Sequence, residues 1–294
     1  AETRQARVLD DMPMQLPPVS EHSRWLINQG WRSSFTLPLF WGEELLGFLF
    51  LNAFSAGAFT PSVRGLLQPH VELLAALITH ELGQLNHLRL ELRLALELTQ
   101  LRDPETGAHL ERVSLYSRLI AKALGPQLGL PSDFADDLYL FASLHDVGKM
   151  AIPEEILRKP GPLDQLERRT MDTHVERGLE LVQRMIDGLH LTSNPKLDML
   201  RHVVGGHHEL LDGSGYPLGL RGEAIPLEAR IIVVADIYDA LTQARVYKPA
   251  MALAEAELLL RQMADDGRLD RRCVEALLAA REPRLAIAAA YRDP

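Results

Sequence analysis

Side chains that can bind metal ions recur between residues 105 and 236, in a part of the chain whose hydrophobic pattern is helical. They are Glu105, His109, His145, Asp146, His174, His207, His208 and Asp236. Helical patterns cover roughly residues 108 to 124, 133 to 146, 163 to 187, 197 to 209, 227 to 243 and 252 to 280. No alternating strand pattern competes with them. The sequence therefore predicts an all-α domain over residues 102 to 294, which gathers these side chains into a site for more than one metal ion.

The N-terminal part has a different pattern. Residues 31 to 54 contain two apolar segments joined by a turn at residues 41 to 44, as in a pair of neighbouring strands. Pro61 and Ser62 then mark the start of a long helical pattern, because both residue types are favoured near the first turn of a helix. These features predict an α+β portion over residues 1 to 70, joined to the all-α domain by a long helix.

Residues 71 to 101 contain no proline and a single glycine, Gly83. Apolar side chains recur in steps of three and four residues at Val71, Leu74, Ile78, Leu85, Leu88, Leu92 and Ala95, with Glu81 as the one misfit in the pattern. Such a seam suits a coiled-coil connector, which would make the protein a homodimer. A helix that packs this stripe on its own domain explains the pattern equally well, and the sequence leaves both alternatives open.

The composition limits the classes of function. With 47% hydrophobic residues the chain can bury two cores, and no apolar run reaches the roughly 20 residues that a membrane span requires. A formal net charge of −9 argues against a general nucleic-acid-binding surface. The single cysteine, Cys273, cannot form an internal disulfide, and no signal-peptide pattern follows the first residue. We therefore expect a cytoplasmic protein in a reducing compartment.

His145 and Asp146 form the first adjacent pair of candidate ligands. A neutral imidazole supplies one nitrogen lone pair, whereas a carboxylate has two oxygens and can bridge two cations, so we assign the bridge to Asp146. Lys149 lies four residues after His145 and would project from the same face of a helix. We expect Lys149 to add positive charge where a phosphate binds.

The other candidates receive unequal support from the sequence. His207 and His208 would diverge by about 100 degrees on a helix, and would then serve neighbouring metal ions. Asp236 lies in an apolar run, where an unpaired carboxylate is costly and a metal or cationic partner is expected. Asp239, three residues later, would support that site. Taken alone, His174 would be an ordinary surface residue.

A glycine-rich connection at residues 211 to 226 lies among the candidate ligands. Long loops in compact domains are more often functional than incidental. Gly213 and Gly215 allow a bulky ligand to approach the backbone closely, while Tyr216 offers a ring for stacking and a hydroxyl for a phosphate. The loop is therefore a candidate binding element.

Five segments in this order resemble the signatures of the HD-GYP domain, a subgroup of HD phosphohydrolases that hydrolyse cyclic di-GMP. They are DPETGAHLERV at 103 to 113, LHDVGKMAIPEEIL at 144 to 157, MDTHVERG at 171 to 178, HHELLDGSGYP at 207 to 217 and ADIYDALTQARVYK at 235 to 248. The resemblance implies iron or manganese as the usual metals. It also implies metal ligands at His109, His145, Asp146, His174, His207, His208 and Asp236.

Glu105 bears on the number of ions. Family members with a glutamate at this position are associated with a third metal ion, so the resemblance implies three ions rather than two. It implies catalytic roles for His145, Asp146 and Lys149. The substrate-binding residues that it implies are Lys149, Gly215, Tyr216, Pro217, Arg245 and Lys248. Val246 departs from the proline that the family often has there, which affects the expected shape of that loop.

A looser resemblance concerns the N-terminal part. A strand SxxLPL, a strand GFLFL and a helix beginning FTPSxxxLL are similar to the C-terminal half of a GAF sensory domain. This implies a partial GAF-like sensor at residues 1 to 70, a connector or dimerisation helix at 71 to 101 and an HD-GYP catalytic domain at 102 to 294. The N-terminal half of a GAF domain would be missing, so no ligand pocket is assigned.

The implied activity is hydrolysis of cyclic di-GMP to linear pGpG, with further cleavage to GMP left open, by a hydroxide held between two cations. One alternative is an HD phosphohydrolase acting on another cyclic dinucleotide or on ppGpp, against which the Gly-Tyr-Pro turn argues. Another is a catalytically weak receptor for cyclic di-GMP that signals through the connector helix or a protein partner, for which the Gly-Tyr-Pro loop is the expected surface. Because every implied ligand is present, catalysis is favoured.

Overall fold

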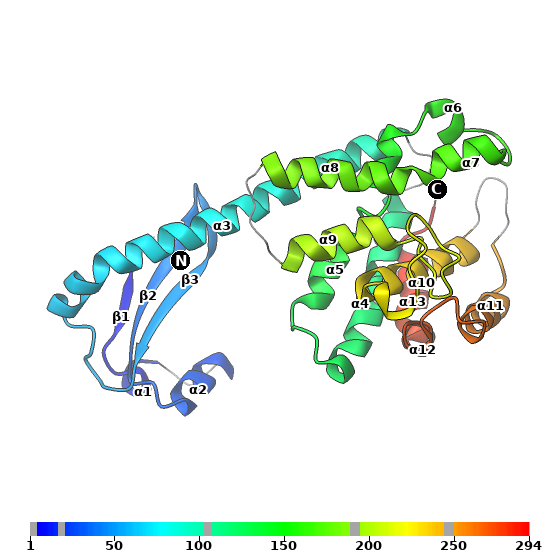
Figure 1. The fold of residues 1–294 in the computed structure, drawn as a ribbon. Coiled ribbons are helices and arrows are strands. Elements are labelled where there is room, and N and C mark those ends of the chain that lie inside the picture. The colour runs from blue at the N-terminus through cyan, green and yellow to red at the C-terminus, as the bar shows by residue number, and fades with distance from the viewer. Residues whose placement is uncertain (1–4, 17–20, 103–106, 189–194, 244–249, 294) are drawn as a thin grey trace. The chain divides into compact units, whose positions relative to one another are not determined.

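The computed structural model describes residues 5–16, 21–102, 107–188, 195–243 and 250–293. The chain divides into two compact units, Ala1–Arg89 and Leu90–Pro294 (Figure 1). The first unit contains a small sheet, and the second is helical. No helix among the described residues is long and apolar enough to cross a membrane.

The N-terminal unit is built on a three-stranded antiparallel sheet in the order β1-β2-β3. Its elements are β1 (Arg7–Leu9), α1 (Met12–Gln15), α2 (Glu21–Asn28), β2 (Ser33–Trp41) and β3 (Glu44–Ala53). The β2 and β3 strands lie where the apolar segments predicted them, and Gly42 forms their turn with a φ of 57°. Strand β1 and helices α1 and α2 were not predicted, because such short elements carry little periodicity.

Helix α3 (Pro61–Arg102) follows the sheet and is 42 residues long. Near its start, Val71 is buried in a cluster with Phe35 and Phe59, which fixes this part of the helix on the sheet. Leu73 and Leu77 are exposed to solvent. The apolar residues of this helix therefore include a group that packs on the unit's own sheet and a group that does not.

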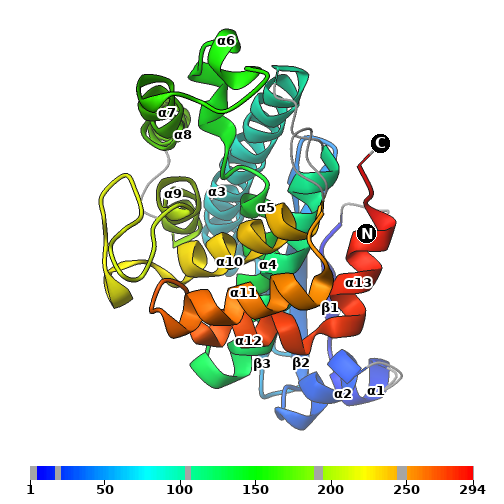
Figure 2. The same cartoon turned by 90° about the vertical axis from the view of Figure 1, so that its right-hand side faces the viewer.

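The C-terminal unit consists of helices around a shared core. They are α4 (Gly107–Leu128), α5 (Phe134–Ala142), η1 (Val147–Ala151), α6 (Glu154–Leu157), α7 (Gln165–Asp172), α8 (His174–Gly188), α9 (Pro195–Gly206), η2 (Gly222–Ala224), α10 (Leu227–Thr242), α11 (Leu253–Asp265), α12 (Arg271–Ala279) and α13 (Arg281–Ala290). Figure 2 shows α10, α11 and α12 stacked one above another. Helix α4 buries Val113, Tyr116, Ile120 and Leu124, whose three- and four-residue spacing gives it one apolar face toward α5, α10 and α12.

Three predicted helices end earlier or are divided in the structure. The helix predicted to reach residue 146 ends at Ala142, so the His145-Asp146 pair lies in a turn. The pattern at 163 to 187 is divided into α7 and α8; α7 begins with a capping box between Asp164 and Glu167. The pattern at 252 to 280 is divided into α11 and α12 by a turn in which Gly267 has a φ of 75°.

Candidate metal centre

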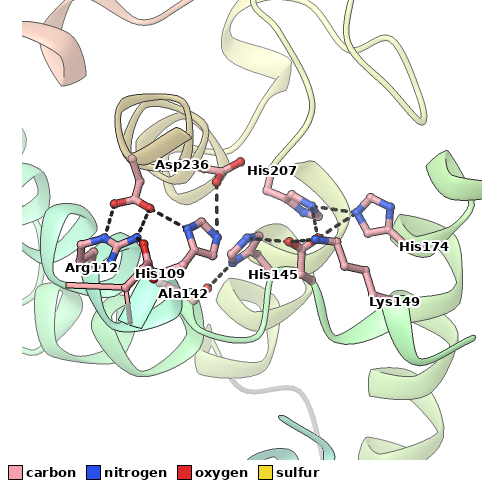
Figure 3. Close-up of polar contacts among 11 residues, drawn as sticks. His109, Arg112, Ala142, His145, Lys149, His174, His207 and Asp236 are labelled. Atoms are coloured by element: carbon pink, nitrogen blue, oxygen red, sulfur yellow. Dashed lines mark hydrogen bonds and ion pairs between the residues drawn. The ribbon is translucent and has the colours of Figure 1, made fainter. Parts of the chain in front are cut away.

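The candidate ligands are brought together from five places in the C-terminal unit (Figure 3). His109 lies in the first turn of α4, and Asp236 lies on α10. The His145-Asp146 pair occupies the turn between α5 and η1, and His174 is the first residue of α8. His207 and His208 directly follow Gly206, where α9 ends. Helix ends and turns therefore supply most of these side chains.

Two groups of ligand atoms share Asp146. Asp146, His174, His207 and His208 form one group, while His109, His145 and Asp146 form the other, and within each group the atoms lie within 4.8 Å of one another. His174 Nε2 is 3.1 Å from Asp146 Oδ1, and His145 Nε2 is 3.1 Å from Asp146 Oδ2. Each carboxylate oxygen thus faces one of the two groups, and the predicted role of Asp146 as a bridge remains a prediction.

We call these groups the first position (His109, His145, Asp146) and the second position (Asp146, His174, His207, His208). The sequence predicted that His207 and His208 would serve neighbouring ions. The structure instead places both in the second position, with ring centroids 4.2 Å apart. The helical divergence does not apply, because both residues lie beyond the end of α9.

Backbone carbonyls orient three of the histidine rings. Nδ1 of His145 lies 2.8 Å from the Ala142 oxygen, Nδ1 of His174 lies 2.8 Å from the Met171 oxygen, and Nδ1 of His207 lies 3.0 Å from the Val204 oxygen. A carbonyl oxygen only accepts hydrogen bonds, so each Nδ1 carries the donated proton. In each neutral ring the Nε2 lone pair is then left for the shared cluster.

His109 is oriented by a carboxylate instead. Its Nδ1 lies 2.8 Å from Asp239 Oδ2, and its Nε2 lies 3.7 Å from Asp236 Oδ1. The sequence predicted that Asp239 would support the site, and in the structure it contacts the candidate ligand His109. Asp236 was predicted as a ligand; among the described residues it lies beside His109 but belongs to neither group of ligand atoms.

The charges around Asp146 shift the pKa values of the cluster. Burial would lower the pKa of His145, but the charges of Asp146 and Asp236 together raise it to about 9. Burial would raise the pKa of Asp146, yet the charges of Lys149 and His145 hold it well below its usual value. The Lys149 ammonium lies 2.9 Å from Asp146 Oδ2, although Lys149 belongs to a 3-10 helix rather than to the predicted α-helix.

At the second position the effect of burial on the histidine pKa values prevails over that of Asp146. Burial lowers the pKa of His207 and, together with the charge of His207, strongly lowers that of His208. Both imidazoles are therefore neutral near pH 7. Neutral imidazole is the form of histidine that binds metals.

The predicted binding loop packs against the second position. The Tyr216 ring stacks on the His208 ring with centroids 4.6 Å apart, and the Tyr216 amide donates to the His208 carbonyl at 3.1 Å. A Cβ at Gly215 would lie 2.4 Å from the same carbonyl oxygen, so only glycine permits this approach. The Tyr216-Pro217 peptide bond is cis. The loop thus places an aromatic ring next to a candidate ligand.

Glu209 contacts the part of this loop that follows Pro217. Its buried carboxylate accepts hydrogen bonds from the amides of Leu218 at 2.7 Å and Leu220 at 2.9 Å. The sequence analysis quoted Glu209 within a motif without giving it a role. Its position directly after two candidate ligands was the available signal.

Arg112 is the other functional residue that the sequence analysis missed. It lies three residues after His109 on α4 and is almost fully buried against Asp239. A charged residue one turn from a candidate ligand, on the same helical face, was the available signal. Glu105, Arg245 and Lys248 lie outside the described residues.

The donor set fits divalent cations. His145 Nε2 and Asp146 Oδ1 are buried, and neither forms a well-oriented hydrogen bond, although ring nitrogens and carboxylate oxygens crowd around them. Buried polar atoms in native structures are nearly always satisfied, so such crowding indicates an absent partner. Imidazole and carboxylate ligands together suit iron, manganese or zinc. The cluster is thus a site that could hold divalent metal ions.

Comparisons with known proteins agree with this chemistry. The HD domain family matches residues 86–273 of the chain. A Vibrio cholerae protein named cyclic di-GMP phosphodiesterase is 40% identical over 200 residues, which cover 67% of this chain and 40% of that protein. The Xanthomonas campestris cyclic di-GMP phosphodiesterase response regulator RpfG is 45% identical over 181 residues, covering 61% and 44%. A V. cholerae 3′3′-cGAMP-specific phosphodiesterase 2 is 38% identical over 193 residues, covering 65% and 34%.

The chain spans less than half of the length of each of these relatives. The family match, in contrast, extends over more than half of the chain itself and includes every described candidate ligand. The protein therefore belongs to the HD domain family.

Proposed function

We propose that this chain is a metal-dependent phosphodiesterase that hydrolyses cyclic di-GMP to linear pGpG, with GMP as a further product. The observation that carries this proposal is the sharing of Asp146 between two groups of ligand atoms. Paired cations are a recurrent solution to the hydrolysis of phosphate esters. Relatives named as cyclic di-GMP phosphodiesterases support the choice of substrate.

Bound divalent cations would supply an activated water and would neutralise charge on the phosphate. In this proposal His109 and His145, with Asp146, hold one cation, while Asp146, His174, His207 and His208 hold another. Asp236 completes the ligand set beside His109. Iron or manganese is our proposed metal. We propose a third ion at Glu105, and this proposal is supported by the sequence alone.

The chain's own side chains would bind and orient the substrate. Lys149 provides an ammonium group near Asp146, where it attracts a phosphate. Burial, followed by the charge of Asp172, raises the pKa of Tyr216, so the hydroxyl stays protonated and can donate to a phosphate oxygen. Gly215 and Pro217 fix the loop that presents this ring. We further propose Arg245 and Lys248 as contacts to phosphate or guanine.

A second substrate has support of its own. Relatives named as 3′3′-cGAMP-specific phosphodiesterases are 38% identical to this chain over 193 and 173 residues. This cyclic dinucleotide shares the two phosphates of cyclic di-GMP and replaces one guanine by adenine. Parallel turnover assays with both dinucleotides distinguish the two candidates.

The N-terminal unit is proposed to regulate this activity. Its antiparallel sheet and following helix are consistent with a partial GAF-like sensor, and the exposed Leu73 and Leu77 on α3 are consistent with a dimerisation helix. We propose that signals pass along this helix to the catalytic unit in a cytoplasmic homodimer, and that signalling proteins bind the loop at Tyr216.

The proposed function is tested by measuring metal content and turnover together. Wild type, loaded anaerobically with Fe²⁺ or with Mn²⁺, should convert cyclic di-GMP to pGpG, as resolved by chromatography. Asp146→Asn should lose both metal and turnover, because the shared carboxylate is weakened. Asp198→Asn, which alters an exposed ion pair with Arg201, is the control and should behave as wild type. Full metal content without product from either dinucleotide would refute the phosphodiesterase and favour a receptor.

A further inference from the structure

A buried arginine connects the candidate metal centre to the segment that follows α13. Arg112 lies on α4, one helical turn beyond His109, and its side chain is 1% exposed. Its Nε donates to Asp239 Oδ1 at 2.6 Å, and its Nη2 donates to Asp239 Oδ2 at 2.9 Å. This paired contact fixes both oxygens of the Asp239 carboxylate.

The same guanidinium also contacts the segment Tyr291–Asp293. Nη1 donates to the Tyr291 carbonyl at 2.7 Å, and Nη2 donates to Asp293 Oδ2 at 3.0 Å. Arg112 therefore joins α4, α10 and this segment at one point. Without residues 291 to 293, a buried guanidinium would lose two acceptors, one of which is its second carboxylate.

The contact between Asp239 and His109 gives this junction a role toward the metal centre. Asp239 accepts the Nδ1 proton of His109 at 2.8 Å, which leaves the His109 Nε2 lone pair for the first position. Arg112 contacts both oxygens of this carboxylate, so it orients the group that orients His109. His145 in the first position and His174 and His207 in the second donate to backbone carbonyls instead, so the Asp239 contact bears on the first position through His109.

We propose that Arg112 is a positioning residue through which the segment Tyr291–Asp293 controls metal occupancy of the first position without controlling the second. The inference rests on the proposed function, in that the cluster must bind metal. It goes beyond that function because metal binding at the first position would depend on a segment that contains no candidate ligand. Anything that displaces residues 291 to 293 from Arg112 would then empty one metal position selectively.

Two variants probe the junction, and each has a matched control. Arg112→Lys keeps the charge but cannot reproduce the paired contact to a carboxylate. Its control is Arg284→Lys, because Arg284 is equally buried in the same unit and contacts Tyr238 and Glu257 rather than any candidate ligand. Asp293→Asn weakens the junction from the other side. Its control is Asp265→Asn, at an exposed ion pair with Arg271.

The experiment measures Mn²⁺ binding to the metal-free full chain by titration calorimetry. Arg112→Lys and Asp293→Asn should lower affinity at the first position by about tenfold or more, the usual effect of losing a group that orients a metal ligand. Affinity at the second position should change less than about twofold. Nitrogen-15 spectra of labelled histidine should show His109 changing from one tautomer to a mixture in both variants, and not in the controls.

Each outcome decides the proposal. Equal losses at both positions, the same selective loss in Arg284→Lys, or unchanged affinity in Asp293→Asn would overturn it. Absence of Mn²⁺ binding to wild type would overturn both the proposed function and this inference. Selective loss of the first position in a protein that does not hydrolyse cyclic di-GMP would support this inference and reject the proposed function.

Discussion

Gly148 lies backbone to backbone against Gly178, where η1 crosses α8. A Cβ at residue 148 would lie 1.9 Å from the His174 carbonyl oxygen and 2.5 Å from the Gly178 amide nitrogen. A Cβ at residue 178 would lie 2.8 Å from a methyl carbon of Val204 on α9. The two glycines therefore set the distance between the segment that carries Asp146 and the helix that begins at His174.

Gly148→Ala is expected to separate these two segments. The added carbon meets backbone atoms, which cannot move aside as a side chain does, so we expect a loss of about 3 kcal/mol in unfolding free energy. Metal content should fall as well, because His174 moves away from Asp146. Chemical denaturation and metal analysis measure the two effects.

Gly188→Ala is the control for this substitution. Gly188 ends the same helix, and a Cβ there would meet no atom within 4 Å. It should leave metal content unchanged and raise stability by at most about 1 kcal/mol, since alanine favours the helix. If Gly148→Ala matched Gly188→Ala in both measurements, the close packing would have no importance for the site.

Glu209→Ala should loosen the loop that carries Tyr216 without emptying the metal centre. Two part-buried hydrogen bonds, from the amides of Leu218 and Leu220, would be lost, and a hydrogen bond to a charged acceptor contributes about 1.5–3 kcal/mol. We expect KM for cyclic di-GMP to rise about tenfold or more, since a positioned stacking ring is worth about 1–3 kcal/mol. Steady-state kinetics and metal analysis provide the test.

Glu209→Gln retains one acceptor oxygen and should be intermediate. Glu223→Gln is the control, because Glu223 is an exposed carboxylate in η2 of the same connection. A fall in metal content that accounts for the whole loss of activity in Glu209→Ala would argue against a loop-positioning role.

Local patterns in the sequence predicted individual strands and helices better than they predicted the contacts between helices. The β2 and β3 strands and the helix α10 lie within one or two residues of their predicted ranges, because their apolar periodicity is a property of the segment itself. The pairing of Arg112 with Asp239 joins residues 127 positions apart. It depends on how α4 crosses α10, which no local pattern encodes.

The metal centre shows the same division. The order and chemistry of the ligands were predictable, since imidazoles and carboxylates are the groups that bind such cations. The grouping of the ligands was not predictable. The sequence analysis assigned His207 and His208 to different metal ions because it assumed that both lie on a helix, but α9 ends at Gly206. Asp236 illustrates a further limit, because a partly buried carboxylate in an apolar run has to find a partner but the partner's identity depends on packing.

The pKa shifts predict that the two metal positions respond differently to pH. The pKa of His145 is raised to about 9, so in the metal-free protein near pH 7 this ring is protonated and a cation must displace its proton. Affinity at the first position should rise about tenfold for each pH unit up to about 9. The pKa values of His207 and His208 are lowered, so the second position should vary much less.

Mn²⁺ titrations at pH 6.5, 7.5 and 8.5 measure this difference. Calorimetry in buffers of different ionisation enthalpy gives an independent count of the protons that are released when the metal binds. In the metal-free protein the raised pKa of His145 also contributes to stability. This contribution is fully present below pH 6.5, the ordinary pKa of histidine, and is lost as the pH rises through about 9. Parallel pH profiles for both positions would contradict the assignment of the proton to His145.

Lys149→Met is expected to separate catalysis from metal binding. The Lys149 ammonium lies 2.9 Å from Asp146 and is 13% exposed, so it both offers charge to a phosphate and competes with cations for the shared carboxylate. Removing it should leave metal affinity equal or higher, while kcat falls about 100-fold through lost charge stabilisation. Lys159→Met is the control, because among the described residues Lys159 pairs with Glu167 and not with a candidate ligand. Unchanged kcat at full metal content would remove Lys149 from the catalytic machinery, whereas loss of metal would assign it to the integrity of the cluster.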